Sequence, residues 1–152
     1  MNAEQSQDVQ FRLTKAEKLC QSYRVKLTPL RKTLLQLLYE NKAPLTAYEL
    51  LRLLRKFYPK IEAMSVYRIL SFLEKYHLIH RVLSCHAYAA CNIPEHQHHP
   101  QLLLCEKCNH SEEIETESLK QAMDDISTKY AFFASKKPIE IFGICQACAI
   151  KP

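Results

Sequence analysis

Two Cys-x-x-Cys pairs in the last third of the chain have the residue types and the spacing of a metal site. The first pair is Cys105 and Cys108, and the second is Cys145 and Cys148. Four thiolates complete the tetrahedral shell of one zinc ion, whereas a single pair would also suit a redox site. The sequence therefore predicts a structural zinc site with these four cysteines as ligands.

The segments around these cysteines predict the small sheet that has to position them. Short strands are expected at 101–104, which is an apolar run, at 111–115 and at 139–142. Residues 118–129 have the period of a helix whose inner face carries Leu119, Met123 and Ile126. Each cysteine pair then lies at a strand end, where one zinc joins the first strand to the third. We expect Gly143, the only glycine, to give a tight turn before Cys145 its backbone freedom.

The first ninety residues predict four helices followed by a hairpin. The helices are expected at 8–23, at 28–39, from a capping box at 46–49 up to Pro59, and at 63–76. Strands are expected at 78–83 and 86–90. This order of elements is typical of a winged helix-turn-helix.

Apolar spacing assigns a buried face to these helices, and Thr28 is expected to cap the second one before Pro29. In the first helix the buried stripe is expected to be Phe11, Ala16, Leu19 and Tyr23. The third is expected to carry Leu50, Leu51, Leu53, Leu54 and Phe57. The fourth is expected to bury Val66, Ile69, Leu70 and Leu73 and to expose Ser65, Tyr67, Arg68 and Ser71. The fourth helix is the candidate recognition helix.

Charge divides the chain into two unlike parts. Residues 1–84 hold 15 Lys and Arg against 7 Asp and Glu, while residues 85–152 hold 6 against 9. A basic module joined to a mildly acidic one suits a DNA-binding domain attached to a domain that stays off the DNA. A well-solvated surface explains the charges equally well, so the balance alone does not decide between the two.

The composition favours a cytoplasmic protein without a membrane span. No apolar run reaches the roughly 18 residues of a span, and residues 1–10 are polar. A reducing compartment disfavours disulfides, which leaves Cys20 and Cys85 as expected free thiols. Residues 92–100 contain two prolines and three histidines and are interpreted as a hinge.

Five motifs in order along the chain resemble those of one known family. They are RVKLTPLR at 24–31, AYEL at 47–50, SVYRIL at 65–70, LCEKC at 104–108 and FGICQAC at 142–148. This set resembles the ferric uptake regulator family, and most closely its zinc uptake regulators, with Leu30 in place of the usual glutamine. The resemblance implies an α+β fold: a winged-helix DNA-binding domain at 1–91, a hinge at 92–100 and a small α/β dimerisation domain at 101–152. It also implies a homodimeric, metal-dependent repressor and not an enzyme.

The zinc-regulator pattern implies a second, regulatory zinc site, and therefore two zinc ions per subunit. Its ligands by position are His80, Cys91, Glu113 and one histidine of the pair at 98–99. Counting back from Cys105 favours His98, whereas counting forward from Cys91 favours His99. We prefer His98, because the strand pairing after the hinge should be stiffer than the hinge itself.

The predicted DNA contacts divide by their chemistry. Arg68 can pair with guanine, and Tyr48 and Tyr67 can reach thymine methyls or phosphates, with Ser65 on the same helix. Candidate phosphate partners are Lys15, Arg24, Lys26 and Arg31. The alternatives are ordinary solvation for the basic residues and core packing for Tyr67.

The function that follows is a zinc-responsive repressor of zinc uptake genes, which binds double-stranded operator DNA and no small-molecule substrate. Iron, manganese or peroxide sensing within the same family is the main alternative. An enzyme alternative is a zinc deaminase, because His110 and Glu112 with the second cysteine pair resemble its ligand pattern. A closed four-cysteine shell and Ile144 in place of a proline oppose it. A zinc-ribbon interaction module would leave the basic half unexplained.

Overall fold

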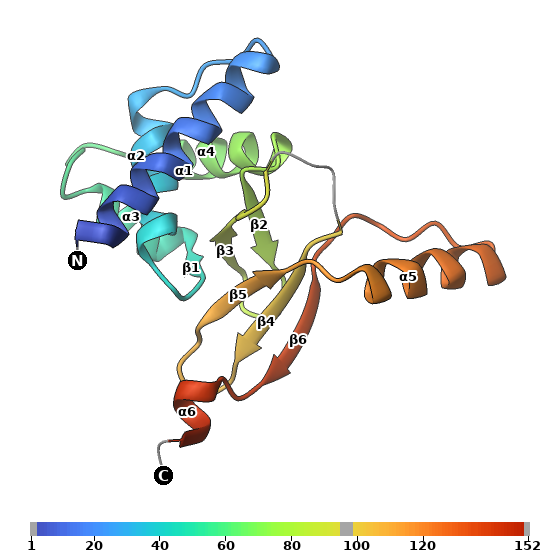
Figure 1. Cartoon of the computed structure of the whole chain (residues 1–152). Helices are drawn as coiled ribbons and strands as arrows, with labels where there is room; N and C mark the ends of the chain where they lie inside the picture. Colours follow the sequence, from blue (N-terminus) through green and yellow to red (C-terminus); the bar gives the residue numbers. More distant parts are fainter. Residues whose placement is uncertain (1–2, 95–98, 151–152) are drawn as a thin grey trace.

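The elements form an N-terminal part, in which four helices accompany a first sheet, and a second sheet below it (Figure 1). The computed structural model describes residues 3–94 and 99–150. The helices are α1 (Ala3–Ser22), α2 (Pro29–Glu40), α3 (Ala47–Leu54), α4 (Ala63–Lys75), α5 (Glu117–Lys129) and α6 (Gln146–Ile150). The strands are β1 (Leu45–Thr46), β2 (Ile79–Val82), β3 (Ala87–Ala90), β4 (Gln101–Cys105), β5 (Ser111–Ile114) and β6 (Ile139–Gly143). This arrangement confirms the predicted fold class, an α+β chain with a winged helix-turn-helix first.

Helices α1 to α4 share one apolar core with the wing sheet, which has the strand order β1-β3-β2. Hairpin β2–β3 is antiparallel and pairs Ile79 with Ala90 and Val82 with Ala87. The predicted inner face of α4 is confirmed, because its four apolar residues are at most 6% exposed. The capping box of α3 is also present, with Glu49 N–H donating to Thr46 Oγ1 at 3.2 Å and Thr46 N–H to Glu49 Oε2 at 2.8 Å. Strand β1, which has two residues, was not predicted.

The buried stripe expected for α1 is confirmed for Ala16 and in part for Leu19, but it was wrong for Phe11 and Tyr23. Phe11 and Tyr23 are 61% and 46% exposed, whereas the residues that face the core are Val9, Leu13, Ala16 and Cys20. Helix α1 contacts α2, while the two aromatic side chains stay exposed. The expectation that large aromatic side chains would be buried therefore gave the wrong result at Phe11 and Tyr23.

Two helix ends also differ from the predictions. Thr28 is the residue before α2, but its side chain makes no capping hydrogen bond. Helix α3 ends at Leu54, well before Pro59, and Phe57 lies beyond it with 62% of its surface exposed. The helix is therefore shorter by about one turn than its apolar pattern indicated.

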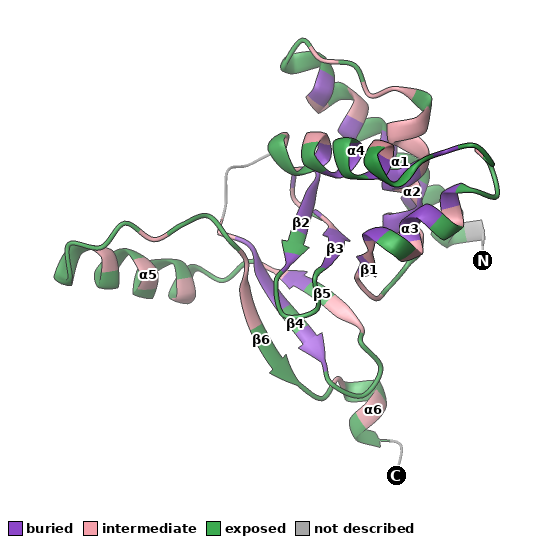
Figure 2. Ribbon diagram, turned by 180° about the vertical axis from the view of Figure 1, so that it is seen from behind, coloured by how far each residue is buried: buried purple, intermediate pink, exposed green. Residues whose placement is uncertain are grey.

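The second sheet has the order β5-β4-β6, with β4 antiparallel to β5 and parallel to β6. Helix α5 extends away from this sheet and contains no buried residue (Figures 1 and 2). The inward stripe predicted for it was therefore wrong for a single chain, since Ile126 is 46% exposed. Gly143 does not need its predicted freedom either, because its φ is not positive and an added Cβ would meet nothing within 4 Å.

A small apolar cluster joins the two sheets. Val82 and Ala89 of the wing sheet pack with Leu102 and Leu104 of β4, and all four are at most 9% exposed. The two sheets therefore have a buried interface of their own. None of the helices in the described part of the chain is long and apolar enough to cross a membrane.

Candidate metal centres

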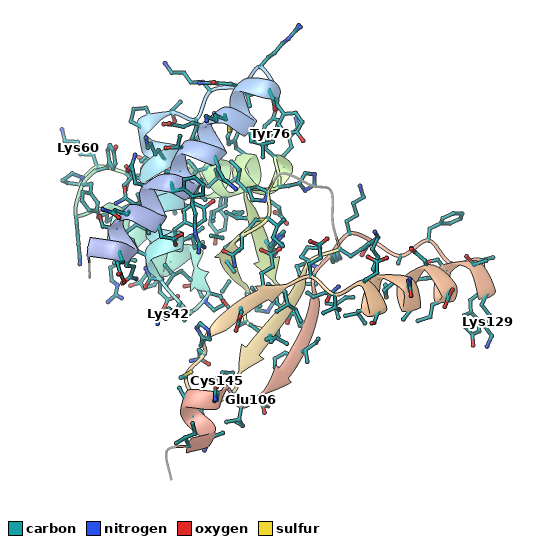
Figure 3. All side chains as sticks on the ribbon, viewed as in Figure 1. Lys42, Lys60, Tyr76, Glu106, Lys129 and Cys145 are labelled. Carbon is teal, nitrogen blue, oxygen red and sulfur yellow. The ribbon has the colours of Figure 1, made fainter. Side chains whose placement is uncertain are left out.

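The four cysteines meet at one end of the second sheet. Cys105 is the last residue of β4 and pairs with Gly143 at the end of the parallel strand β6, so Cys145 lies next to it in space. Cys108 belongs to the turn after β4, and Cys148 lies in α6. The sulfur atoms all lie within 4.8 Å of one another. Figure 3 shows Cys145 beside α6, close to the turn that carries Glu106.

The spacing of these sulfur atoms fits a tetrahedral zinc site. Zinc–sulfur bonds of about 2.3 Å place two ligands of a tetrahedron about 3.8 Å apart. The Sγ atoms of Cys108 and Cys145 are 3.7 Å apart, and all four cysteines are free thiols. The donor set and its dimensions therefore suit zinc.

Backbone groups already favour a thiolate at this centre. The backbone N–H of Cys145 donates to Cys105 Sγ at 3.3 Å. This bond and a second one from the N–H of Cys108 lower the pKa of Cys105 to about 6. Hydrogen bonds with the side chains of Cys108 and Cys145 raise the pKa of Cys148 to about 12. Backbone donors at this centre thus stabilise the thiolate form that zinc binds.

A second cluster lies between the two sheets. It consists of His80 on β2, Cys91 immediately after β3 and Glu113 on β5, whose ligand atoms lie within 4.8 Å of one another. All three residues are buried, at 7%, 0% and 9% exposure. Two of them come from the wing hairpin and one from the second sheet, so the cluster bridges the parts of the chain.

Glu113 accepts most of the hydrogen bonds in this cluster. Its Oε1 lies 2.8 Å from His80 Nε2 and 3.8 Å from Cys91 Sγ. Its Oε2 accepts from the backbone N–H of Asn92 at 2.6 Å. Burial, followed by the Glu113 charge, raises the pKa of Cys91, so this thiol holds its proton.

These three residues fit three corners of a zinc shell after a small adjustment. Zinc bonds of about 2.0–2.3 Å set ligand atoms about 3.3–3.8 Å apart. The contact between Cys91 and Glu113 already has this length, whereas that between His80 and Glu113 is shorter, as a hydrogen bond should be. A metal would replace the bridging protons and spread these two ligands by about half an ångström.

The fourth corner is the one position that the sequence left open. His98, the preferred ligand, lies outside the described residues. His99 is described, and it is not part of the cluster of ligand atoms. The arrangement of the other three leaves a tetrahedral shell with one ligand still to be supplied.

The predicted DNA-contact residues lie mostly on the surface of the helical part. Tyr48 and Tyr67 are 75% and 50% exposed, which removes core packing as the role of Tyr67. The other exposed members are Lys15, Arg24, Lys26 and Arg68, while Ser65 is half-buried. Arg31 is already held, because it stacks 3.5 Å above the Phe72 ring and donates to the carbonyl of Lys26.

Three residues at the junction of the two parts were not singled out from the sequence. Arg12 donates to Asn92 Oδ1 at 2.6 Å, and Asn92 in turn donates to Glu113. Glu140 accepts from the backbone N–H groups of Leu83 and Ser84. The partners in these hydrogen bonds are 21 to 80 residues apart in the sequence, so no local sequence pattern predicts them.

Comparisons with known proteins agree with these features. The model of the Ferric uptake regulator family matches residues 22–142. The zinc uptake regulation protein of Escherichia coli (strain K12) is 33% identical over 137 residues, which are 90% of this chain and 80% of that protein. These matches confirm the resemblance inferred from the motifs.

Solved structures add the arrangement of the two parts. A zinc uptake regulator in complex with zinc and DNA superposes with a TM-score of 0.85 at 32% identity, covering 93% of this chain and 95% of the other. Holo XcZur has a TM-score of 0.80 at 28% identity, with 90% and 96% covered. Apo XcZur has the same identity, with 94% and 99% covered, but a TM-score of only 0.55. The described arrangement is thus much closer to the holo form than to the apo form.

Proposed function

The chain belongs to the Ferric uptake regulator family, and we propose that it is a zinc-responsive repressor, which binds operator DNA as a homodimer when its regulatory zinc site is filled. The observation that carries the proposal is the buried cluster of His80, Cys91 and Glu113 between the two sheets. Buried ionisable side chains of these types are costly unless they bind a partner. These three side chains hydrogen-bond with one another, and a cation at this position would take the place of the protons that they share.

Zinc at this cluster would act by fixing the two sheets against each other. The wing hairpin supplies the imidazole and the thiolate, and β5 supplies the carboxylate. A ligand that binds one arrangement more tightly shifts the population towards it. In a dimer, the angle between the parts sets the spacing of the two recognition helices and hence their fit to successive half-sites. The higher TM-scores against the zinc–DNA complex and holo XcZur support this direction of the change.

The four-cysteine centre has a different role in this proposal. It closes its own shell and ties the end of β4 to the segment after β6, so it stabilises the second sheet. Two zinc ions per subunit follow, one structural and one regulatory, with His98 as the fourth regulatory ligand. A closed shell also leaves no position for a catalytic water, and the family is one of regulators, so the deaminase alternative is rejected.

The donor set favours zinc over the other metals of the family. Thiolate and imidazole ligands suit zinc, whereas iron(II) and manganese(II) prefer more oxygen ligands in an octahedral shell. Cys91 is the discriminating residue, since it is fully buried and its sulfur is directed at the carboxylate. Iron, manganese or peroxide sensing therefore remains the second candidate.

The exposed face of α4 is the surface proposed to read DNA. Tyr67 and Arg68 are exposed on it, and Arg31 packs on Phe72 of the same helix. Arg68 would pair with a guanine, and Lys15, Arg24, Lys26 and Arg31 with Tyr48 would contact the backbone. The DNA partner also implies the cytoplasm as the place of action.

Metal titration of the apo regulatory site tests this function. Zinc, iron(II) and manganese(II) are added to the protein while DNA binding is followed by fluorescence anisotropy. We expect zinc at the lowest free concentration to tighten binding, and His80→Ala and Cys91→Ser to remove the response. Cys85→Ser is the matched control, because Cys85 is an exposed thiol in the wing turn. A normal zinc response in Cys91→Ser would disprove the zinc-sensor function.

A further inference from the structure

A carboxylate from the second sheet holds the turn of the wing hairpin. Glu140 Oε1 accepts from the backbone N–H of Leu83 at 2.6 Å, and its Oε2 accepts from that of Ser84 at 3.2 Å. Both donors lie in the turn directly after β2, beyond the last paired residue Val82. Bonds of this kind, with an ionised acceptor, are stronger than those between neutral groups.

Glu140 is placed at the opposite end of the sheet junction from the regulatory cluster. Its partner in the parallel pairing is Leu102, which belongs to the apolar cluster with Val82. His80 and Leu83 are three residues apart along the wing, which is about 10 Å of extended chain. Along the junction, the metal-binding cluster therefore comes first, the apolar cluster with Val82 and Leu102 lies in the middle, and Glu140 lies on the far side.

Two separated attachments fix an orientation that one attachment would leave free to pivot. The regulatory cluster is one attachment, and it depends on the metal under the proposed function. The bonds from Leu83 and Ser84 to Glu140 are the other, and they need no metal. We propose that Glu140 is a positioning residue, which holds the wing against the second sheet and thereby lowers the free zinc concentration at which the protein binds DNA.

This inference rests on the proposed function and extends it to how the zinc threshold is set. The apparent affinity of a ligand falls by the fraction of protein in the competent arrangement. Removing a metal-independent attachment lowers that fraction, so more zinc is required to reach the same occupancy. The zinc ligands themselves are not altered.

The test compares Glu140→Ala and Glu140→Gln with Glu112→Gln, a change at an exposed glutamate on β5, the other edge strand of the same sheet. In Glu140→Ala, we expect half-maximal DNA binding to need about five- to tenfold more free zinc, the size of a typical coupling between two sites. Glu140→Gln keeps one carbonyl oxygen and should shift less. DNA affinity at saturating zinc should match that of the unaltered protein.

Amide hydrogen exchange measures the attachment itself without zinc or DNA. The amides of Leu83 and Ser84 should exchange about tenfold faster in Glu140→Ala than in the unaltered protein and in Glu112→Gln. Unchanged exchange there, or an unchanged zinc midpoint in a zinc-responsive protein, would overturn the role of Glu140. If DNA affinity at saturating zinc fell while the midpoint stayed constant, Glu140 would act on DNA binding directly and the inference would also fail. Absence of any zinc response in the unaltered protein would instead refute the proposed function.

Discussion

Replacing Glu113 by alanine should lower the free energy of unfolding of the zinc-free protein and also lower the affinity of the regulatory site for zinc. The Glu113 side chain is fully buried, and it accepts hydrogen bonds from His80 Nε2 at 2.8 Å and from Asn92 N–H at 2.6 Å. Removing the buried acceptor of two such bonds typically costs about 1–3 kcal/mol for each donor. We therefore expect Glu113→Ala to lower the free energy that holds the two sheets together by about 2–6 kcal/mol.

Loss of a direct ligand should also weaken regulatory zinc binding, by more than the roughly 10- to 100-fold that is typical when a hydrogen-bond partner of a metal ligand is removed. Urea unfolding with the regulatory site emptied by a chelator measures the loss in the free energy of unfolding. Competition with a zinc indicator measures the loss in zinc affinity. Glu112→Ala is the control, because Glu112 is the adjacent residue on β5 and is exposed. A variant at position 113 that unfolds at the original urea concentration and binds zinc with the original affinity would show that this carboxylate neither joins the sheets nor binds the metal.

Three other changes separate the roles of the remaining parts. Arg68→Ala should lose about 1–3 kcal/mol of operator binding in anisotropy titrations, because it removes a bidentate base contact; unchanged operator affinity would exclude it as a base-reading residue. Glu49→Gln should lower the free energy of unfolding by about 0.5–1 kcal/mol at neutral pH. The bonds from Thr46 lower the pKa of Glu49, so its stabilisation is present above the unfolded pKa and is lost as the pH falls through the lower folded value. Urea unfolding at several pH values should show that the unaltered protein and Glu49→Gln have the same free energy of unfolding in acid. A difference between them that persists in acid would contradict this origin. Cys148→Ser should remove one zinc per chain in metal analysis of the purified protein, and an unchanged zinc content would mean that the four-cysteine centre is not a zinc site.

Local signals predicted the helical part well, and they failed where two faces of a helix compete. The capping box at Thr46 and the inner face of α4 depend only on residues three or four apart. In α1, however, Phe11 and Tyr23 were expected on the same buried stripe as Ala16, and they are exposed whereas Ala16 faces the core. Which stripe is buried depends on the surface of α2, and spacing within α1 does not contain that information.

The same difference between local and long-range information applies to the candidate metal centres. The four cysteines are predictable because each pair is local and only the two pairs have to be brought together. His80, Cys91 and Glu113 were expected only through the family resemblance, since each alone has an ordinary sequence context. The bonds made by Asn92 and Glu140 could not have been predicted, because they arise from how the wing packs on the second sheet.

Helix α5 shows how a wrong prediction of burial can still indicate a function. Its apolar stripe at Leu119, Met123 and Ile126 is present in the sequence, yet the helix has no buried residue. On β6, the next element along the chain, and in the segment after it, Ile141, Phe142 and Ile144 are 40%, 54% and 46% exposed. An amphipathic helix is stabilised mainly by packing of its apolar face, so a stripe that one chain leaves uncovered calls for a surface from outside that chain. A second copy presents the same stripe by symmetry, which makes a twofold homodimer the simplest closed assembly that buries both. In the proposed homodimer, the cluster of His80, Cys91 and Glu113 and the Glu140 carboxylate would lie between the α5 interface and the two copies of α4, so that a small change of angle there would change the distance between the two α4 helices.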